Sequence, residues 1–283
     1  MIFIAAATSQ LGNLVIQSLL EKIPASQIIA GVRDTNKAQN LSAKGVTLRI
    51  ADYNDPDGLE RALLGVDKLL LISSGDIAAS RQQQHANVID AAKKAGVGLI
   101  AYTSILNADT SELLLAKDHQ ETEKYLKASG VPYVFLRDGW YIENYTGSIP
   151  VALQHGAIIG ASGDGKISAA ARKDYAEAAA VVLTSDGHEN KIYELAGDNA
   201  FTLNEYADEL SKQVGKTIPY VNLPKDEYAA ALVGAGLPEA LVNILADSDI
   251  GASKGQLYSK SKDLGGLIGR PTTTLKDVIA SSI

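Results

Sequence analysis

Short apolar runs alternate with amphipathic stretches along the first part of the chain. The runs that predict strands are Ile2–Ala6, Gln27–Val32, Val46–Ile50, Lys68–Ser73, Leu99–Thr103 and Tyr133–Leu136. The stretches with helical spacing are Leu11–Lys22, Asn36–Ala43, Asp57–Leu64, Ala86–Ala95 and Asp118–Ala128. Strands that alternate with helices predict a parallel sheet covered by helices on both faces. The pattern is therefore typical of an α/β protein with a doubly wound parallel sheet of Rossmann type.

The residues that end the predicted helices agree with this assignment. Gly45, Gly65, Gly96 and Gly130 each follow a helical stretch, where a residue with positive φ commonly ends a helix. After about residue 140 the alternation loosens. We expect residues 1–140 to form an NAD(P)-binding core, to which a helix and a strand within 172–197 return. Residues 141–171 and 198–283 are expected to form a smaller, mostly helical C-terminal substrate lobe.

Composition excludes several kinds of function. The chain has no cysteine, and its four histidines form no zinc-binding pattern, so no metal site is expected. A net charge of −7 gives no electrostatic reason for direct nucleic-acid binding. No apolar run approaches the length of a membrane span, and the first residues lack the basic region of a signal peptide. We therefore expect a soluble, cytoplasmic protein.

The turn after the first strand reads AAATSQLG and resembles a dinucleotide-binding turn. In such turns glycines let the backbone approach the pyrophosphate and let the helix pack on the strand. Only Gly12 is a glycine here, and Ala6 and Ser9 occupy the other two glycine positions of a GxxGxxG spacing. If both positions need positive φ, the strain is about 1 kcal/mol each. A turn that binds no ligand is the alternative.

The end of the second strand carries a signal for the cofactor. Arg33 lies about 20 residues beyond the turn, where an arginine accommodates the 2′-phosphate of NADP and an acid holds the ribose of NAD. Asp34 is the competing signal, but its side chain should point away from the face that Arg33 uses. The pattern favours NADPH, with Lys37 nearby. A solvated surface arginine is the alternative.

Longer stretches carry a family resemblance over essentially the whole chain. They include KLLLISS at 68–74, IAYTS at 100–104, HQETEK at 119–124, RDGWY at 137–141, GASKG at 251–255 and PTTTL at 271–275. In these stretches the chain resembles the NmrA-like, atypical short-chain dehydrogenases, and within them the bacterial NADPH-dependent quinone oxidoreductases of type 2. The resemblance implies an enzyme that uses NADPH for the two-electron reduction of a quinone or another planar acceptor.

The resemblance also implies site residues. Cofactor contacts are expected from Ala6, Ala7, Thr8, Ser9, Gln10, Leu11, Arg33, Asp52, Ile72, Ser73, Thr103 and Ser104. The substrate and the nicotinamide are expected against Arg137, Asp138, Gly139, Trp140, Tyr141 and Ile142. The family's usual turn is TGATGQLG and its usual RNGWY has an asparagine at position 138, so this chain departs from the family at both places. A carboxylate at 138 normally cannot donate the hydrogen bond that an amide can.

The chain lacks the usual catalytic pair of short-chain dehydrogenases. Tyr258 is the one tyrosine followed four residues later by a lysine, and it lies near the C-terminus, far from the fifth strand. A quinone needs less help, since the anion formed by hydride transfer is delocalised and takes a proton from water. Tyr141 and His119 are the candidates for a catalytic role, and Trp140, Tyr141 and Tyr145 for an aromatic wall.

Each of these residues also has an ordinary structural interpretation. The aromatic side chains could pack in a core or an interface, and His119 could make ordinary hydrogen bonds on a helix surface. The acidic and basic residues Glu121, Glu123 and Lys124 are expected on a solvated helix face. Two other functions stay open: an NmrA-like regulator that senses NADP(H) with little catalysis, and a paralogue without a working dinucleotide site. Assembly as a homodimer is left open as well.

Overall fold

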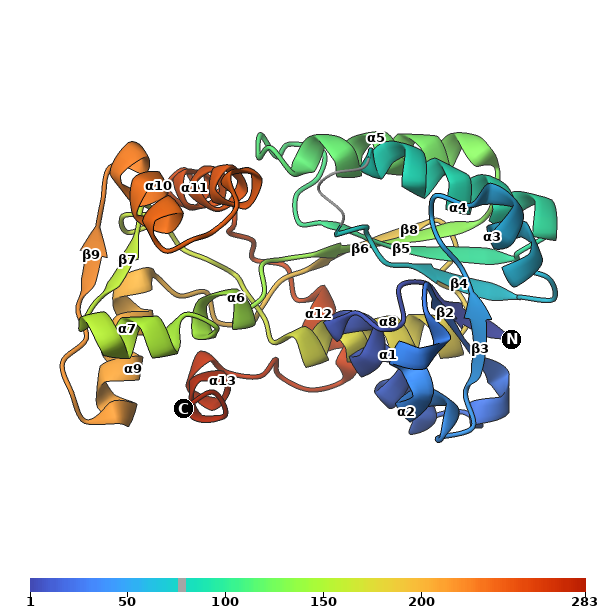
Figure 1. Cartoon of the computed structure of the whole chain (residues 1–283), viewed down its shortest axis with the longest axis horizontal. Coiled ribbons are helices and arrows are strands. Elements are labelled where there is room, and N and C mark those ends of the chain that lie inside the picture. The colour runs from blue at the N-terminus through green and yellow to red at the C-terminus, as the bar shows by residue number, and fades with distance from the viewer. Residues whose placement is uncertain (76–79) are drawn as a thin grey trace. The chain divides into compact units, whose positions relative to one another are not determined.

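The computed structural model describes residues 1–75 and 80–283 (Figure 1). The chain forms two compact units. Unit 1 contains Met1–Ile105, Asp118–Asp138 and Lys173–Tyr193, and unit 2 contains Leu106–Lys117, Gly139–Arg172 and Glu194–Ile283.

A seven-stranded sheet organises the chain. Its strands are β1 (Ile2–Ile4), β2 (Ile28–Val32), β3 (Thr47–Ile50), β4 (Lys68–Leu71), β5 (Leu99–Ile105), β6 (Tyr133–Asp138) and β8 (Lys191–Leu195). They lie in the order β3-β2-β1-β4-β5-β6-β8, and the pairs from β3 through β6 are parallel. The order reverses at β1, which pairs with β2 on one side and β4 on the other. Ligands of open α/β sheets bind beyond the carboxyl ends of the strands at such a reversal.

Helices cover both faces of this sheet, as Figure 1 shows. One face carries α3 (Pro56–Ala62), α4 (Arg81–Ala95) and α5 (Ala116–Ser129), and the other carries α1 (Gln10–Leu20), α2 (Gln39–Ser42) and α8 (Arg172–Thr184). In α1 the buried Leu11, Val15 and Leu19 recur at intervals of four residues, which places them on one side of the helix. Phe3, Leu69 and Phe135 belong to one core cluster on the sheet, and each is at most 1% exposed.

The predicted fold class is confirmed, and the differences lie at the ends of elements. All four helix-ending glycines have positive φ, between 72° and 84°. The predicted helix Asn36–Ala43 begins instead as a 3₁₀ helix over Thr35–Ala38, because Asp34 accepts the amide hydrogen of Asn36. Helix α4 begins at Arg81, well before the predicted Ala86, because the Ser80 side chain caps it. Its polar first turn has no apolar period that could have indicated a helix.

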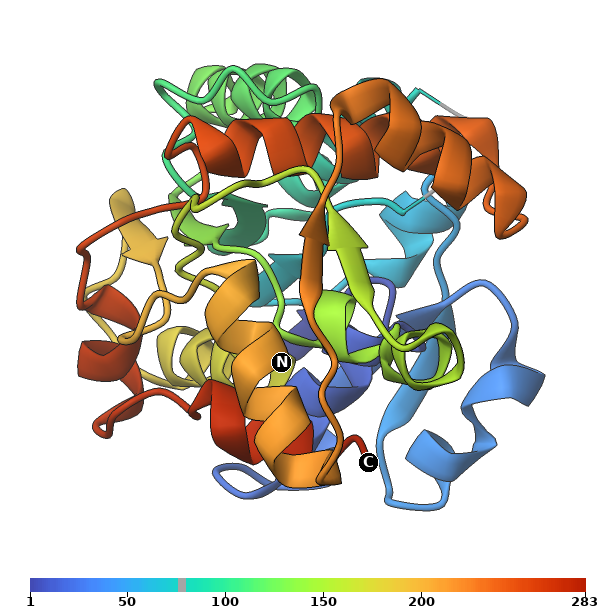
Figure 2. The same ribbon diagram turned by 90° about the vertical axis from the view of Figure 1, so that its left-hand side faces the viewer.

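Unit 2 is mostly helical, with one small sheet. Its helices are α6 (Glu143–Thr146), α7 (Ile149–His155), α9 (Leu203–Val214), α10 (Lys225–Gly234), α11 (Glu239–Ser253), α12 (Asp263–Ile268) and α13 (Leu275–Ala280). Strands β7 (Ile158–Gly160) and β9 (Tyr220–Asn222) pair in parallel, and Figure 2 shows them side by side. The sequence did not predict this sheet, because strands of three residues are too short to establish a period of two.

Among residues 1–75 and 80–283, no helix combines the length and the apolar character needed to cross a membrane. Within the same ranges, no three acidic or histidine side chains converge in a way that could hold a metal ion.

Candidate functional site

A pocket of about 780 Å³ lies in unit 1, beyond the carboxyl ends of β1, β2, β3 and β4. This volume is in the usual range for small-molecule and cofactor sites. The residues that line the pocket are Ala6, Thr8, Ser9, Gly31, Val32, Arg33, Ala51, Asp52, Tyr53, Asn54, Ile72, Ser73, Ser74, Gly75 and Gln84. The pocket therefore occupies the ligand position that the reversal of strand order predicts.

The turn between β1 and α1 has the shape of a dinucleotide-binding turn despite its missing glycines. Ala6 has φ of 49°, in the left-handed region that favours glycine. A Cβ atom added to Gly12 would come within 2.6 Å of the Ala6 carbonyl oxygen and 2.9 Å of the Ala7 Cα atom. Only glycine lets the helix approach the strand this closely, so Gly12 performs the packing role of the last glycine in the motif.

Ser9 differs from the expectation that it is strained. Its φ is −66°, and its side chain is the N-cap of α1, where Oγ accepts the amide hydrogen of Gly12 at 3.0 Å. The strain that the sequence suggested at two positions is therefore confined to Ala6, and the part of the prediction concerning Ser9 is wrong. The physical reason is that a serine with ordinary φ can cap the helix with its own hydroxyl.

We expect Ala6→Gly to tighten NADPH binding about fivefold. A left-handed residue with a Cβ atom costs about 1 kcal/mol relative to glycine, and a turn without this cost reaches its binding geometry more easily. The measurement is NADPH affinity by fluorescence titration of the purified protein. Ser9→Gly is the comparison, and it should lower thermal stability through the lost cap without tightening binding. Equal affinities of Ala6→Gly and the unmodified protein would show that the strain does not oppose binding.

Arg33 and Asp34 have different roles at the end of β2. Arg33 lines the pocket and is exposed. Asp34 does not line it, and its carboxylate accepts the amide hydrogen of Asn36 at 2.9 Å. Of the two competing signals, the arginine is therefore the one that faces the pocket, and the acid serves local structure.

The structure brings some of the expected cofactor residues together and leaves others apart. Those that line the pocket are Ala6, Thr8, Ser9, Arg33, Asp52, Ile72 and Ser73. Those that do not are Ala7, Gln10, Leu11, Thr103 and Ser104. Thr103 acts on the pocket indirectly, because its Oγ1 atom accepts the amide hydrogen of Ser73 at 2.8 Å.

Sequence reasoning missed several residues of the pocket. Tyr53 and Asn54 follow Asp52 in the loop after β3, and Gln84 comes from α4. The Tyr53 hydroxyl donates to the Ile72 carbonyl at 2.8 Å and so joins the loops after β3 and β4. Position directly after a buried strand was a usable signal for Tyr53 and Asn54. Gln84 belongs to a run of three glutamines that the sequence does not distinguish.

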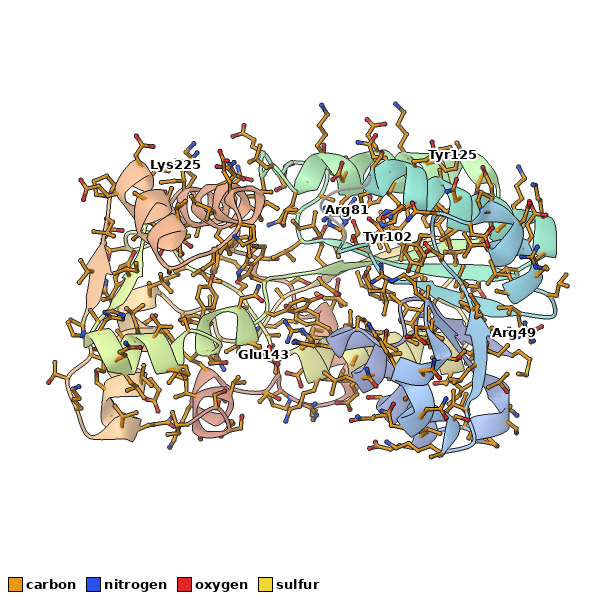
Figure 3. All side chains as sticks on the ribbon, in the orientation of Figure 1. Arg49, Arg81, Tyr102, Tyr125, Glu143 and Lys225 are labelled. Atoms are coloured by element: carbon orange, nitrogen blue, oxygen red, sulfur yellow. The ribbon has the colours of Figure 1, made fainter. Side chains whose placement is uncertain are left out.

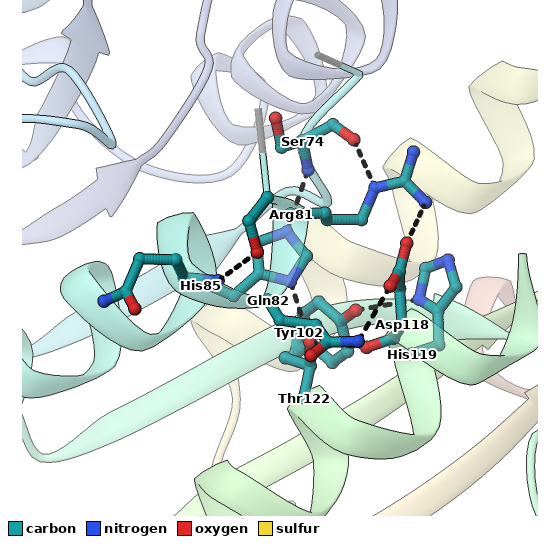
Figure 4. A network of polar contacts seen from close by, with 10 residues as sticks. Ser74, Arg81, Gln82, His85, Tyr102, Asp118, His119 and Thr122 are labelled. Carbon is teal, nitrogen blue, oxygen red and sulfur yellow. Dashed lines mark hydrogen bonds and ion pairs between the residues drawn. The ribbon is translucent and has the colours of Figure 1, made fainter. Parts of the chain in front are cut away.

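In the loop after β4, hydrogen bonds hold both the amide and the carbonyl of Ser74, as Figure 4 shows. The Ser74 amide donates to Nε2 of His85 at 2.9 Å, and the Ser74 carbonyl accepts from Nε of Arg81 at 2.8 Å. Arg81 is itself paired with Asp118, at 3.3 Å between Nη1 and Oδ2. Helices α4 and α5 therefore fix the backbone that forms one wall of the pocket.

His85 is a neutral imidazole with a defined tautomer. Its Nε2 atom accepts from the Ser74 amide, so the proton is on Nδ1, which lies 2.9 Å from Thr122 Oγ1. The Thr122 hydroxyl donates to the Asp118 carbonyl and can accept that proton's hydrogen bond. Burial, and secondarily the charge of Arg81, lower the pKa of His85 to about 3. The support of Ser74 is therefore independent of pH in the physiological range.

His119 lies in the core, and its expected place on a helix surface is wrong. It is 8% exposed, and its Nδ1 atom is 2.8 Å from the hydroxyl of Tyr102. Tyr102, on β5, lies near Arg81, on α4 (Figure 3). Burial lowers the pKa of His119 to about 3, with smaller effects of Arg81 and His85. Near neutral pH no imidazolium is present there to donate a proton.

Arg137, an expected substrate contact, is 2% exposed and forms a two-point ion pair with Glu123. Its Nε donates to Oε1 at 2.9 Å and its Nη2 to Oε2 at 2.7 Å. The Ser104 hydroxyl donates to the same carboxylate at 2.6 Å. Glu123 is therefore buried, and its expected place on a solvated helix face is wrong, whereas Glu121 and Lys124 pair in solvent at 3.8 Å. Asp138, next to Arg137, is 6% exposed.

In unit 2, the backbone after β6 is fixed by hydrogen bonds. The Ala170 amide donates to the Trp140 carbonyl at 3.1 Å, and the Ile142 amide donates to the Ala170 carbonyl at 3.0 Å. Trp140 and Tyr141 are half-buried, and the Arg172 guanidinium lies 4.5 Å from the centre of the Tyr141 ring. Gly139 is also half-buried, and Ile142 is 1% exposed. The two aromatic side chains thus stand on a rigid support.

Tyr145 and Tyr258 both belong to unit 2. The ring of Tyr145 packs against Phe201 and Tyr206, with centroids 5.8 and 6.1 Å away. Residues 258–262 precede α12 and are not helical. Lys262 is paired with Asp198 at 3.1 Å. The tyrosine and lysine of this stretch therefore lack the helical spacing of the dehydrogenase pair.

Comparisons with known proteins agree with this site. A sequence model of the NAD(P)H-binding family matches residues 6–186. Quinone oxidoreductase 2 of Escherichia coli is 58% identical over 280 residues, which cover 99% of this chain and 98% of that protein. The structure of an NADPH-dependent quinone oxidoreductase from E. coli complexed with NADPH has a TM-score of 0.97 at 58% identity and 99% coverage of both chains.

A second solved structure extends the comparison. Triphenylmethane reductase of Citrobacter sp., complexed with NADP(H), has a TM-score of 0.96 at 41% identity and full coverage of both chains. The family resemblance that the sequence motifs indicated is confirmed. The chain therefore belongs to the NmrA-like, NAD(P)H-binding family of reductases that includes quinone oxidoreductase 2 of E. coli.

Proposed function

We propose that the protein is an NADPH-dependent quinone reductase. The observation that carries the proposal is the pocket of unit 1, with Arg33 exposed at the end of β2. It is supported by the 58% identity, over nearly the whole chain, to a protein named as a quinone oxidoreductase.

The residues of the pocket fit a bound dinucleotide. The volume of about 780 Å³ suits a cofactor, and the close approach at Gly12 brings the first turn of α1 to the pyrophosphate position. Arg33 would hold the 2′-phosphate, Asp52 would face the adenine, and Ile72 with Ser73 would line the wall. Thr103 would contribute indirectly, by accepting the amide hydrogen of Ser73, and Ser104 by donating a hydrogen bond to Glu123. When bound, NADPH supplies a hydride.

The quinone would lie against Trp140 and Tyr141. Both side chains are half-buried on a backbone that hydrogen bonds hold in place, so they offer apolar surface to a flat ring. The hydride adds two electrons to the quinone, and the resulting hydroquinone anion takes its proton from water. The protein therefore needs only to bind and orient the cofactor and the quinone and to exclude competing reactions. It needs no acid of its own.

A quinone-reduction assay tests the wall. Trp140→Ala and Tyr141→Ala should each raise the Michaelis constant for a benzoquinone about threefold to tenfold, since an aromatic contact is worth about 0.5–1.5 kcal/mol. NADPH absorbance is followed without added flavin. Tyr258→Phe is the matched control and should leave the rate within about threefold, well below the effect of a lost general acid.

The outcomes separate the alternatives. Binding of NADPH without turnover of any quinone would contradict the enzyme and favour the regulator that senses NADP(H). Loss of activity in Tyr258→Phe, with no change in Trp140→Ala and Tyr141→Ala, would place the substrate elsewhere on the chain.

A further inference from the structure

Gln84 is the pocket residue whose hydrogen bonding is incomplete. It lines the pocket from α4 and is only 3% exposed. Its Nε2 atom donates to Asn54 Oδ1 at 3.3 Å. Its Oε1 atom is buried and has no hydrogen-bond partner among the described residues. An acceptor left in this state is costly, so it indicates a donor on the ligand.

The position of Gln84 in the pocket identifies the part of the ligand it faces. Its amide contacts Asn54, in the loop after β3 that also presents Asp52. The side chain of Asn87 ties the same loop to α4 by donating to the Tyr53 carbonyl at 2.9 Å. The groups suited to phosphate, Arg33 and the turn before α1, follow β2 and β1 instead. The loop after β3 and α4 therefore form a separate corner of the pocket.

The chemistry of this corner favours a neutral hydrogen-bond donor. Asp52 and the Oε1 atom of Gln84 both present acceptors there, and one Asp52 oxygen already accepts the Asn54 amide hydrogen at 2.9 Å. A phosphate would be repelled by these oxygens. Of the parts of a dinucleotide, the exocyclic amino group of adenine is a donor and belongs to a flat base that fits beside a loop wall.

We propose that Gln84 is a specificity-determining residue for the base of the cofactor, with its Oε1 atom accepting a hydrogen bond from the 6-amino group of adenine. The inference rests on the proposed use of NADPH. A base with an oxo group at position 6 would place an acceptor against this acceptor. Rotation of the Gln84 amide alone would not remedy this, because it would turn Oε1 toward Asn54 Oδ1 and give up the hydrogen bond between the two side chains.

The test compares NADPH with its hypoxanthine analogue, deamino-NADPH, by titration of the full-length protein. The unmodified protein should bind NADPH about tenfold more tightly, as expected for a buried hydrogen bond. In Gln84→Met the preference should fall below about threefold, mainly through weaker NADPH binding. Gln83→Met is the matched control on the same helix, since Gln83 is exposed, and it should keep the full preference.

The ratio of the two affinities distinguishes recognition from a structural role. If Gln84→Met weakened both cofactors equally and left the ratio unchanged, Gln84 would only support the pocket and the proposal would be overturned. Equal binding of both cofactors by the unmodified protein, or tighter binding of the analogue, would overturn it as well, while the proposed NADPH-dependent function would stand. Binding of neither cofactor would contradict both proposals. Gln84→Leu, checked by thermal unfolding, replaces the methionine variant if that variant fails to fold.

Discussion

Glu123→Gln is expected to lower the free energy of unfolding by about 3–5 kcal/mol, because it removes the carboxylate charge that pairs with the buried guanidinium of Arg137. The two side chains are 3% and 2% exposed, and the carboxylate accepts two hydrogen bonds from the guanidinium and one from Ser104. Replacement by an amide keeps the shape of the residue and removes the charge. Urea unfolding of the purified protein measures the loss.

The same helix provides the control for this experiment. Glu121 pairs with Lys124 at 3.8 Å on the solvent side of α5, and exposed pairs of this kind contribute about 0–1 kcal/mol. Glu121→Gln should therefore change the unfolding free energy by less than about 1 kcal/mol. Replacing both Glu123 and Arg137 by methionine should recover much of the loss, since both charges of the buried ion pair are then removed together. Equal effects at positions 121 and 123 would contradict the assignment of a buried ion pair.

Arg33→Ala is expected to remove about 1.5–3 kcal/mol of the preference for NADPH over NADH, the range for a hydrogen bond to a charged group. That corresponds to roughly tenfold to 150-fold in the ratio of affinities. The reason is that Arg33 is exposed in the pocket, and no ion pair with a described residue competes for its guanidinium. Fluorescence titration with each cofactor measures the ratio.

The affinity for NADH serves as the internal reference, because NADH lacks the 2′-phosphate and should bind Arg33→Ala almost as it binds the unmodified protein. Lys37→Ala is the second comparison. Lys37 is exposed in the 3₁₀ helix that follows β2 and does not line the pocket, so its effect should be smaller. If the unmodified protein bound both cofactors equally, Arg33 would have no role in cofactor choice.

The sequence predicts the central sheet well, because buried strands and amphipathic helices impose their periods directly on the chain. The helix and the strand predicted within 172–197 are present as Arg172–Thr184 and Lys191–Leu195. The pattern fails where local polarity hides an element. Helix α4 starts with Arg81 and three glutamines, and its first turn is defined by the cap of Ser80. The three-residue strands of unit 2 could not be predicted from the sequence either, since each forms only by pairing with the other.

The candidate site shows the same limit. The turn after the first strand and the end of the second pointed to Ala6 and Arg33, the family resemblance implied Asp52 and Ile72, and all four line the pocket. Burial of polar helix residues could not be predicted, because it depends on partners from distant segments. Glu123 is buried through Arg137 on β6, and His85 through Ser74 in the loop after β4. For Ser9, the sequence indicated a missing glycine, whereas the structure shows a helix cap.

The packing at Gly12 limits how far this turn can diverge among related proteins. Even an alanine there would collide with the backbone of Ala6 and Ala7, so the position cannot accept another residue without moving the helix. Positions 6 and 9 already hold other residues, at the cost of one left-handed alanine and with the gain of one cap. A motif search that demands all three glycines would therefore discard sequences such as this one. A search that requires only the last glycine, together with a basic residue at the end of the second strand, would retain them.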